Sequence, residues 1–299
     1  MKTRLLIEQH FHGAYGVDFN KANASEVLDL AVEIKKDGVG GIFPTLVTDS
    51  VENIKRQIKI IKEASLKQKE GAKILGVHLE GIFINPEKKG IHNPKYFLEP
   101  NIDNFKLVED DFIKIVTIAP ELIKDNLIQY LSSGNIKIQA GHCTGSDLRG
   151  CNGVTHTFNA MSGISHRGGS TALSALINDD IYTEIIADGI HVSDEALKLL
   201  FKSKPKDKII LISDSLPCAH SNLKEFIFAD EKVYFDGEKA TSAQGTLAGS
   251  AKLLPDIVKI IGNKGMFDSQ FIENPYIYHK IDLDGKIEWD EDFNIVSIK

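Results

Sequence analysis

The stretch KILGVHLEGIFINPEKKGIHNP, which spans Lys73 to Pro94, carries the clearest signal of the fold. A short apolar run bounded by turn residues, here Ile74 to Val77, predicts a strand that is buried on both faces. Glu80 stands at the end of this strand, and a buried carboxylate costs several kcal/mol unless a cation or a proton offsets its charge. Glu80 therefore needs a partner, and the ends of the other strands can supply one.

The composition bounds the kind of protein. The chain has 299 residues, 42% of them hydrophobic and 26% charged, as in an ordinary soluble globular protein. Its net charge of -7 argues against a nucleic-acid partner, and no apolar run approaches the ~18 residues that span a membrane. Three cysteines are too few for a disulfide framework, and no leader peptide is recognisable. We therefore expect a cytoplasmic protein without a membrane or nucleic-acid partner.

Seven further apolar runs resemble the one before Glu80, and most are followed by a helical pattern. The eight predicted strands are 5–7, 39–47, 73–80, 112–120, 136–143, 154–161, 181–192 and 208–216. Short buried strands that alternate with helices indicate a parallel α/β architecture, and eight of them favour a closed (β/α)8 barrel of the TIM type. An open doubly wound sheet is the alternative, but no glycine-rich phosphate turn follows the first strand to support it.

The domain prediction follows from where this alternation stops. Residues 1–265 are predicted to form the barrel, with a β-hairpin inserted near 219–246. Residues 266–299 are predicted to form a small C-terminal β appendage, whose turn we place at Asp284-Gly285. The predicted helices cover 23–36, a stretch that ends near 70, one that ends near 131, 170–177, 193–201 and one that ends near 261.

Histidines and carboxylates recur at the ends of five predicted strands. The candidate metal ligands are His10, His12, Glu80, His142, His156 and Asp214. His10 and His12 are two residues apart, so in a strand they project from the same face. A mixture of imidazole and carboxylate suits one or two ions of Zn²⁺ or Fe²⁺, or of Mn²⁺ or Co²⁺, better than Ca²⁺ or Mg²⁺.

Each of these residues also has an ordinary structural explanation. A single histidine at a strand end is more often a hydrogen-bonded core or surface residue, and His166, His220 and His279 are assigned to that class. Glu80 alone could pair with a lysine, and Asp214 alone could cap a turn. The metal hypothesis rests on all six residues lying at the same end of one barrel, where the active sites of such barrels are found.

A metal at this position predicts a reaction class. A bound divalent ion lowers the pKa of water toward ~7 and polarises a carbonyl group. Asp214, at the end of the last strand, is the natural group to accept the proton of that water and pass it to a leaving amine. The prediction is metal-assisted hydrolysis of an amide or a related C–N bond.

Six motifs carry a resemblance to a known family. They are HLEGIFINPEKKGIHNP (His78–Pro94), GHCTG (Gly141–Gly145), THTFNAM (Thr155–Met161), ADGIHV (Ala187–Val192), SDS (Ser213–Ser215) and GTLAGS (Gly245–Ser250). In kind and order they resemble the N-acetylglucosamine-6-phosphate deacetylases of the amidohydrolase superfamily. The similarity runs from Ile7 to about Leu254, which is most of the chain.

The resemblance implies roles for individual residues. It implies that Glu80, His142 and His156 hold the principal metal, and that Asp214 acts as general base and then as general acid. His10 and His12 match members of the family that bind a second metal, and His92 matches the histidine that polarises the acetyl carbonyl. The implied contacts to the sugar phosphate come from Asn159, Ala160, Arg167 and His191, some of them donated across a homodimer interface. An arginine and a histidine suit a phosphate dianion.

The sequence departs from the family pattern in a few places. Only Met1 to Arg4 precede the first strand, so the N-terminal half of the usual small β-sandwich is predicted to be absent and the C-terminal half reduced. Gly168 to Ser170 stand where EPG is common, Ile82 replaces a common proline, and the connection between the fifth and sixth strands is short.

We predict a metal-dependent hydrolase that converts N-acetylglucosamine 6-phosphate to glucosamine 6-phosphate and acetate. One alternative is another N-acetylhexosamine phosphate or a different acyl amide, such as a cyclic imide or an acyl amino acid. A third hypothesis is a non-catalytic sensor that binds a sugar phosphate. Turnover of an unphosphorylated amide would favour the different hydrolase, and ligand binding without turnover would favour the sensor.

Overall fold

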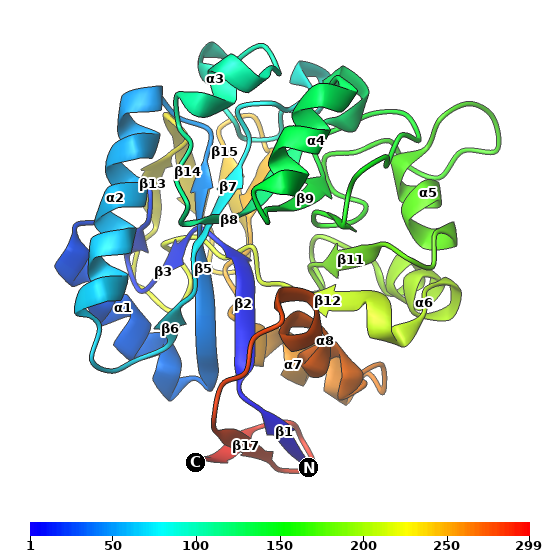
Figure 1. The fold of residues 1–299 in the computed structure, drawn as a ribbon. Coiled ribbons are helices and arrows are strands. Elements are labelled where there is room, and N and C mark those ends of the chain that lie inside the picture. The colour runs from blue at the N-terminus through cyan, green and yellow to red at the C-terminus, as the bar shows by residue number, and fades with distance from the viewer.

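A curled sheet of eight parallel strands forms the centre of the molecule (Figure 1). The computed structural model describes all residues from Met1 to Lys299. In chain order the strands are β2 (Leu6–Phe11), β5 (Val39–Val47), β7 (Val77–Glu80), β8 (Ile113–Ile118), β9 (Lys137–Ala140), β10 (Gly153–Val154), β11 (Tyr182–Ile185) and β12 (Ile209–Leu211). Their order in the sheet follows the chain, and each neighbouring pair is parallel.

The two edges of the sheet meet at its carboxyl end. The amide of Asp214, after β12, donates to the carbonyl of His10 in β2, and the amide of His12 donates to the carbonyl of Ser215. These backbone bonds curl the sheet in the manner of a TIM-type barrel, as the strand count predicts. Both faces of the strands are buried, and the buried residues include polar ones such as Gln9, His78 and Gln139 beside the apolar ones.

Helices cover the outside of the sheet. They are α1 (Ala24–Lys36), α2 (Val51–Lys67), α3 (Ile102–Lys106), α4 (Asp125–Ser133), α5 (Thr171–Ile177), α6 (Asp194–Ser203), α7 (Leu254–Asn263) and α8 (Gln270–His279). Helix α1 illustrates the sequence logic: Asn23 caps its first turn in a capping box with Glu26, and Val27, Leu30 and Ile34 form its buried face. No helix has the length and apolar character needed to cross a membrane.

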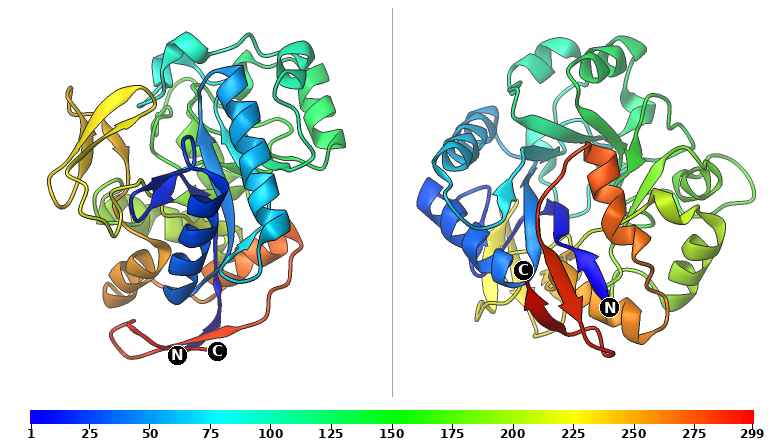
Figure 2. Two further views of the ribbon diagram at one scale, coloured as in Figure 1. Left: turned by 90° about the vertical axis from the view of Figure 1, so that its left-hand side faces the viewer. Right: turned by 60° about the horizontal axis from the view of Figure 1, so that its bottom comes forward.

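The predicted insertion after the eighth strand is a larger sheet than a hairpin. Strands β13 (Glu225–Phe228), β14 (Glu231–Phe235), β15 (Ala240–Ser242) and β16 (Leu247–Gly249) pair in order and antiparallel. Phe228 in this sheet is fully buried, and its ring lies 5.1 Å from the ring of His12. The inserted sheet therefore forms one wall above the carboxyl end of the barrel (Figure 2, left).

The appendage differs from its prediction in three respects. Residues 270–279 form α8, because Phe271, Ile272 and Tyr276 pack on the barrel at helical spacing although Pro275 interrupts the pattern. Strand β1 (Lys2–Arg4) joins β17 (Lys286–Trp289) and β18 (Ile295–Ile298), so the N-terminus contributes a strand. The turn between β17 and β18 contains Asp290 and Asn294 rather than Asp284-Gly285.

Candidate metal centre

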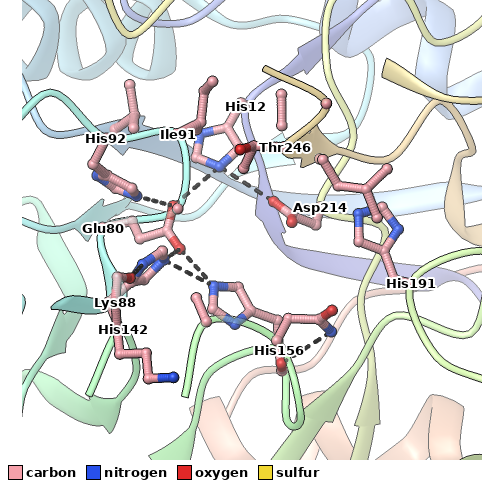
Figure 3. A pocket seen from close by; sticks show the side chains of 18 of the residues that line it. His12, Glu80, Lys88, Ile91, His92, His142, His156, His191, Asp214 and Thr246 are labelled. Carbon is pink, nitrogen blue, oxygen red and sulfur yellow. Dashed lines mark hydrogen bonds and ion pairs between the residues drawn. The ribbon is translucent and has the colours of Figure 1, made fainter. Parts of the chain in front are cut away.

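Glu80 projects from the end of β7 into the middle of the carboxyl end of the barrel (Figure 3). Its Oε1 atom lies 3.2 Å from Nε2 of His142 and 3.0 Å from Nε2 of His156. The two imidazole nitrogens are 3.1 Å apart. All three side chains are at most 5% exposed. The predicted principal ligands therefore lie together.

The separations within this group fit a metal ion. Zn–N and Zn–O bonds are about 2.0 to 2.2 Å long, so ligand atoms around one ion lie roughly 3 to 3.5 Å from one another. The three atoms of the Glu80 group meet that condition, and one oxygen facing two imidazole nitrogens at once is the donor set expected around a cation.

A second group lies directly beside the first. His10 Nε2 and His12 Nε2 lie 3.4 Å and 3.3 Å from Oδ1 of Asp214. Nε2 of His10 has no hydrogen-bond partner although it is fully buried, which is a costly arrangement unless a cation completes it. Glu80 joins the two groups, because its Oε1 is 3.4 Å from His10 Nε2 and its Oε2 is 3.1 Å from His12 Nε2.

The charges of the site balance only when it contains a cation or bound protons. Burial alone would raise the pKa of Glu80, but the neighbouring histidines hold it well below its usual range. Burial would likewise raise the pKa of Asp214, and His10 and His12 lower it. Burial opposes protonation of His12, yet the hydrogen bonds to Asp214 and Glu80 raise its pKa to about 9. The protein thus places two buried carboxylates where positive charge must be present.

Hydrogen bonds on the far side of the histidine rings fix their orientation. Nδ1 of His10 donates to Oε2 of Glu184 at 3.1 Å, and Nδ1 of His142 donates to the carbonyl of Lys88 at 2.7 Å. In both rings the proton is therefore on Nδ1 and the lone pair of Nε2 points into the site, as metal ligation requires. The sequence analysis missed Glu184, although a glutamate inside a buried apolar strand carries the same signal that singled out Glu80.

The backbone turns sharply at three of the candidate ligands. His142, His156 and Asp214 have φ values of 48°, 29° and 51°, in the left-handed region that residues other than glycine seldom adopt. Extended backbone therefore cannot continue through these residues. For this reason β10 ends at Val154, shortly before His156, although we predicted a strand to Met161. Backbone in this region is often found at functional sites.

His92 belongs to the loop that follows Glu80. Its Nδ1 accepts from the hydroxyl of Thr48 at 2.8 Å, because that hydroxyl in turn accepts from the amide of Ile82. The remaining proton of His92 is then on Nε2, which lies 3.5 Å from Oε2 of Glu80. Burial and the nearby His142 lower the pKa of His92 to about 4, so the ring is neutral near pH 7 and can donate one hydrogen bond.

Gly81 makes this arrangement possible. Its φ is +110°, and a Cβ atom there would lie 1.9 Å from Oγ1 of Thr48 and 3.1 Å from Nδ1 of His92. A side chain at this position would displace the hydroxyl that orients His92. The glycine after the metal-site glutamate is therefore required by contact as well as by backbone conformation.

A cavity of about 470 Å³ opens above the two groups. His12, Glu80, His142, His156 and Asp214 line its floor, and His92, Asn159, Ala160 and His191 line it as well. Nδ1 of His191 donates to Oδ2 of the buried Asp188 at 2.8 Å, which orients the ring. Burial lowers the pKa of His191, but that contact outweighs it and raises the pKa. Asp188 is a second residue that the sequence analysis missed.

Arg167 is one of two predicted site residues that do not line the cavity. It lies on an exposed loop before α5, and its amide donates to the hydroxyl of Ser165. His10 also does not line the cavity, because it lies beneath His12 within β2. The structure therefore brings the other predicted residues to one place and leaves Arg167 outside it.

This chain is similar in sequence to several known enzymes and in fold to several solved structures. No family model matches it. An N-acetylglucosamine-6-phosphate deacetylase of Bacillus subtilis is 34% identical over 82% of this chain and 65% of that protein. The enzyme of the same name from Haemophilus influenzae is 31% identical over 86% and 70%. An N-acetylgalactosamine-6-phosphate deacetylase of Escherichia coli O157:H7 is 33% identical over 82% and 67%. The chain spans about two thirds of the length of these relatives.

Solved structures of the same enzyme family have the same fold as this chain. The N-acetylglucosamine-6-phosphate deacetylases of Pasteurella multocida and Thermotoga maritima superpose with TM-scores of 0.89 and 0.88. Each is 26% identical to this chain and covers all of it, and the chain covers 84% and 86% of them. The whole fold, appendage included, is therefore shared with these proteins.

Proposed function

Because this chain belongs to the N-acetylglucosamine-6-phosphate deacetylase family, we propose that it hydrolyses N-acetylglucosamine 6-phosphate to glucosamine 6-phosphate and acetate. The observation that carries the proposal is the Glu80 group, whose three ligand atoms lie 3.0 to 3.2 Å apart at the floor of an open cavity. Asp214 lines the same cavity and supplies a base beside these ligands.

A divalent metal held by Glu80, His142 and His156 would polarise the acetyl carbonyl and lower the pKa of the attacking water. Asp214 accepts a proton from that water while the water oxygen bonds to the carbonyl carbon. It then delivers the proton to the sugar nitrogen as the C–N bond breaks, so that acetate and the amine leave with atoms balanced. Nε2–H of His92 donates to the carbonyl oxygen, where negative charge develops.

We propose that His10 and His12, with Asp214, provide a second metal position next to the first. The donor set favours Zn²⁺ or Fe²⁺, with Mn²⁺ or Co²⁺ as alternatives. The unpartnered Nε2 of His10 supports this second position.

Asn159, Ala160 and His191 are proposed to bind the sugar phosphate, because they lie on the cavity wall. Arg167 is exposed and outside the cavity, which supports the proposal that it serves the site of a second subunit in a homodimer. The small sheet of β1, β17 and β18 is proposed to be the reduced counterpart of the family's β-sandwich. The three free cysteines suit a reducing compartment such as the cytoplasm.

A second substrate has specific support. The relative from Escherichia coli O157:H7 is an N-acetylgalactosamine-6-phosphate deacetylase, and its identity to this chain nearly equals that of the Bacillus subtilis enzyme. Both substrates should therefore be assayed side by side.

The test is acetate release by metal-reconstituted protein, with Asp214→Asn as the catalytic variant and the exposed Asp29→Asn as the matched control. We expect turnover by the wild type and by the control, and a loss of about a thousandfold or more in Asp214→Asn with its metal content retained. Metal content without turnover of either sugar phosphate would reject the deacetylase, and ligand binding in that case would support the sensor.

A further inference from the structure

A second pocket opens at the opposite end of the barrel. It has a volume of about 320 Å³ and is lined by residues of the central strands, near their amino ends, and by the end of α8. Figure 2, right, shows α8 at this end of the barrel. Phe43 of β5 and Leu75, which precedes β7, form its apolar wall, and Tyr278 and His279 of α8 lie opposite. Its size is within the range of small-molecule sites.

Three lysines line this pocket, and no carboxylate does. Lys114 comes from β8, Lys137 begins β9, and Lys280 follows α8. None of the three has an acidic side chain within ion-pair distance; Nζ of Lys114 donates only to the carbonyl of Asp111. In a protein with a net charge of -7, three lysines without an ion-pair partner line one pocket.

Lys137 and the aromatic side chains at the end of α8 form part of the pocket lining. Nζ of Lys137 lies 4.9 Å from the centre of the Tyr278 ring, so the ammonium is held against the protein instead of extending into solvent. Burial, together with the charge of Lys280, lowers the pKa of Lys137. The ring of His279 stacks on Phe43 with centroids 4.2 Å apart, and its Nε2 donates to Gln9, which leaves a neutral aromatic surface for a ligand.

These features select a class of ligand. Three ammonium groups are point charges that suit the tetrahedral oxygens of a phosphate, whereas a planar carboxylate is matched better by the fork of an arginine, and the pocket has none. The wall of Phe43 and Leu75 favours an apolar or aromatic substituent beside the charge. We propose that this pocket is a binding site for a small phosphate monoester, held by Lys114, Lys137 and Lys280 and independent of the metal centre.

The experiment uses the full chain with its metal, in phosphate-free buffer, and phenyl phosphate as the probe. Binding is measured by calorimetry for the wild type, for Lys137→Gln with Lys280→Gln, and for the matched control Lys198→Gln with Lys202→Gln. The control removes two exposed lysines of α6 and changes the net charge equally. We expect one binding event to weaken about tenfold or more in the pocket variant only.

Three results would overturn the proposal. They are an equal loss in both double variants, the absence of any binding event that the pocket variant weakens, and density for the probe only elsewhere in a soaked wild-type crystal. A phosphate that binds at the metal centre is retained in the pocket variant, so this test and the test of deacetylation fail separately. If a variant folds poorly, the position of phenyl phosphate in the soaked wild-type crystal still tests whether the pocket binds it.

Discussion

The two ends of the barrel are built from the same strands but carry opposite chemistry. At the carboxyl end, Glu80 and Asp214 are buried within 3.5 Å of several imidazole nitrogens. At the amino end, Lys114, Lys137 and Lys280 are partly or fully exposed and have no acidic partner. One end therefore offers ligand atoms that suit a cation, and the other offers ammonium groups that suit an anion. The two ends of a parallel barrel are therefore far enough apart for one to be lined by buried carboxylates and the other by lysines.

The largest effect should come from the carboxylate that joins the two metal groups. In Glu80→Gln, five histidines would face a neutral amide, so we expect the metal to be lost and kcat to fall by about a thousandfold or more. Metal content and acetate release are the measurements. Glu121→Gln is the matched control, because Glu121 lies at the same end but contacts only Asn85 and Thr144. A Glu80→Gln protein that keeps its metal would show that Glu80 is not a ligand.

A smaller effect is expected from the residue behind His10. Glu184 accepts from Nδ1 of His10 and from Gln9, whose amide oxygen accepts from His279 at the amino end. Glu184→Gln would weaken the orientation of His10, and we expect metal affinity to fall about 10- to 100-fold.

A metal titration against a competing chelator measures the effect of Glu184 without relying on turnover. If kcat falls while the affinity for both metal equivalents is unchanged, the positioning role of Glu184 is wrong. Glu184→Gln also changes the chain of hydrogen bonds from His10 through Glu184 and Gln9 to His279, which connects the two ends of the barrel.

The hydroxyl of Thr48 should matter for catalysis and little for the metal. Thr48→Val removes the hydroxyl, which is the closer of the two Thr48 groups that donate to Nδ1 of His92, and leaves the amide at 3.4 Å. We therefore expect kcat to fall about tenfold while metal content is unchanged. In the parallel variant Thr48→Ser the hydroxyl is kept, and most of the activity should return. Equal activity in the valine and serine variants would contradict the assigned orientation of His92.

The mildest test varies pH. The pKa of His12 is raised above its ordinary value of 6.5 to about 9, so its ion pairs stabilise the metal-free fold fully below pH 6.5. That contribution is lost as the pH rises through about 9, and metal binding gains over the same interval because the ligand must lose its proton.

We therefore expect the thermal midpoint of the metal-free protein to fall between pH 6.5 and 9, and the apparent metal affinity to rise. The metal-free Glu80→Gln variant should show less of this slope, since one partner of His12 is gone. A pH-independent metal affinity over that range would argue against His12 as a ligand.

Much of the site could be predicted from sequence because the period of a strand fixes where its side chains point. Strand ends in a parallel barrel share one mouth, so His10, His12, Glu80 and Asp214 could be grouped before any coordinates. Glu184 was missed because its partner, His10, is 174 residues away in the sequence. Asp188 was missed because its contact with His191 depends on a local turn. Helix α8 was missed because Pro275 hides a helical pattern that only packing on β2 and β12 reveals.

The strand order, the residue types of the candidate metal centre and the family could be predicted from the sequence, since these depend on local periodicity and on short motifs. The distances of 3.0 to 3.2 Å around Glu80, the tautomers of His10 and His142 and the exposed position of Arg167 became known only from the three-dimensional structure. It alone brought Lys114, Lys137 and Lys280 together. Contacts between residues remote in sequence depend on how the sheet closes, and no local pattern encodes that closure.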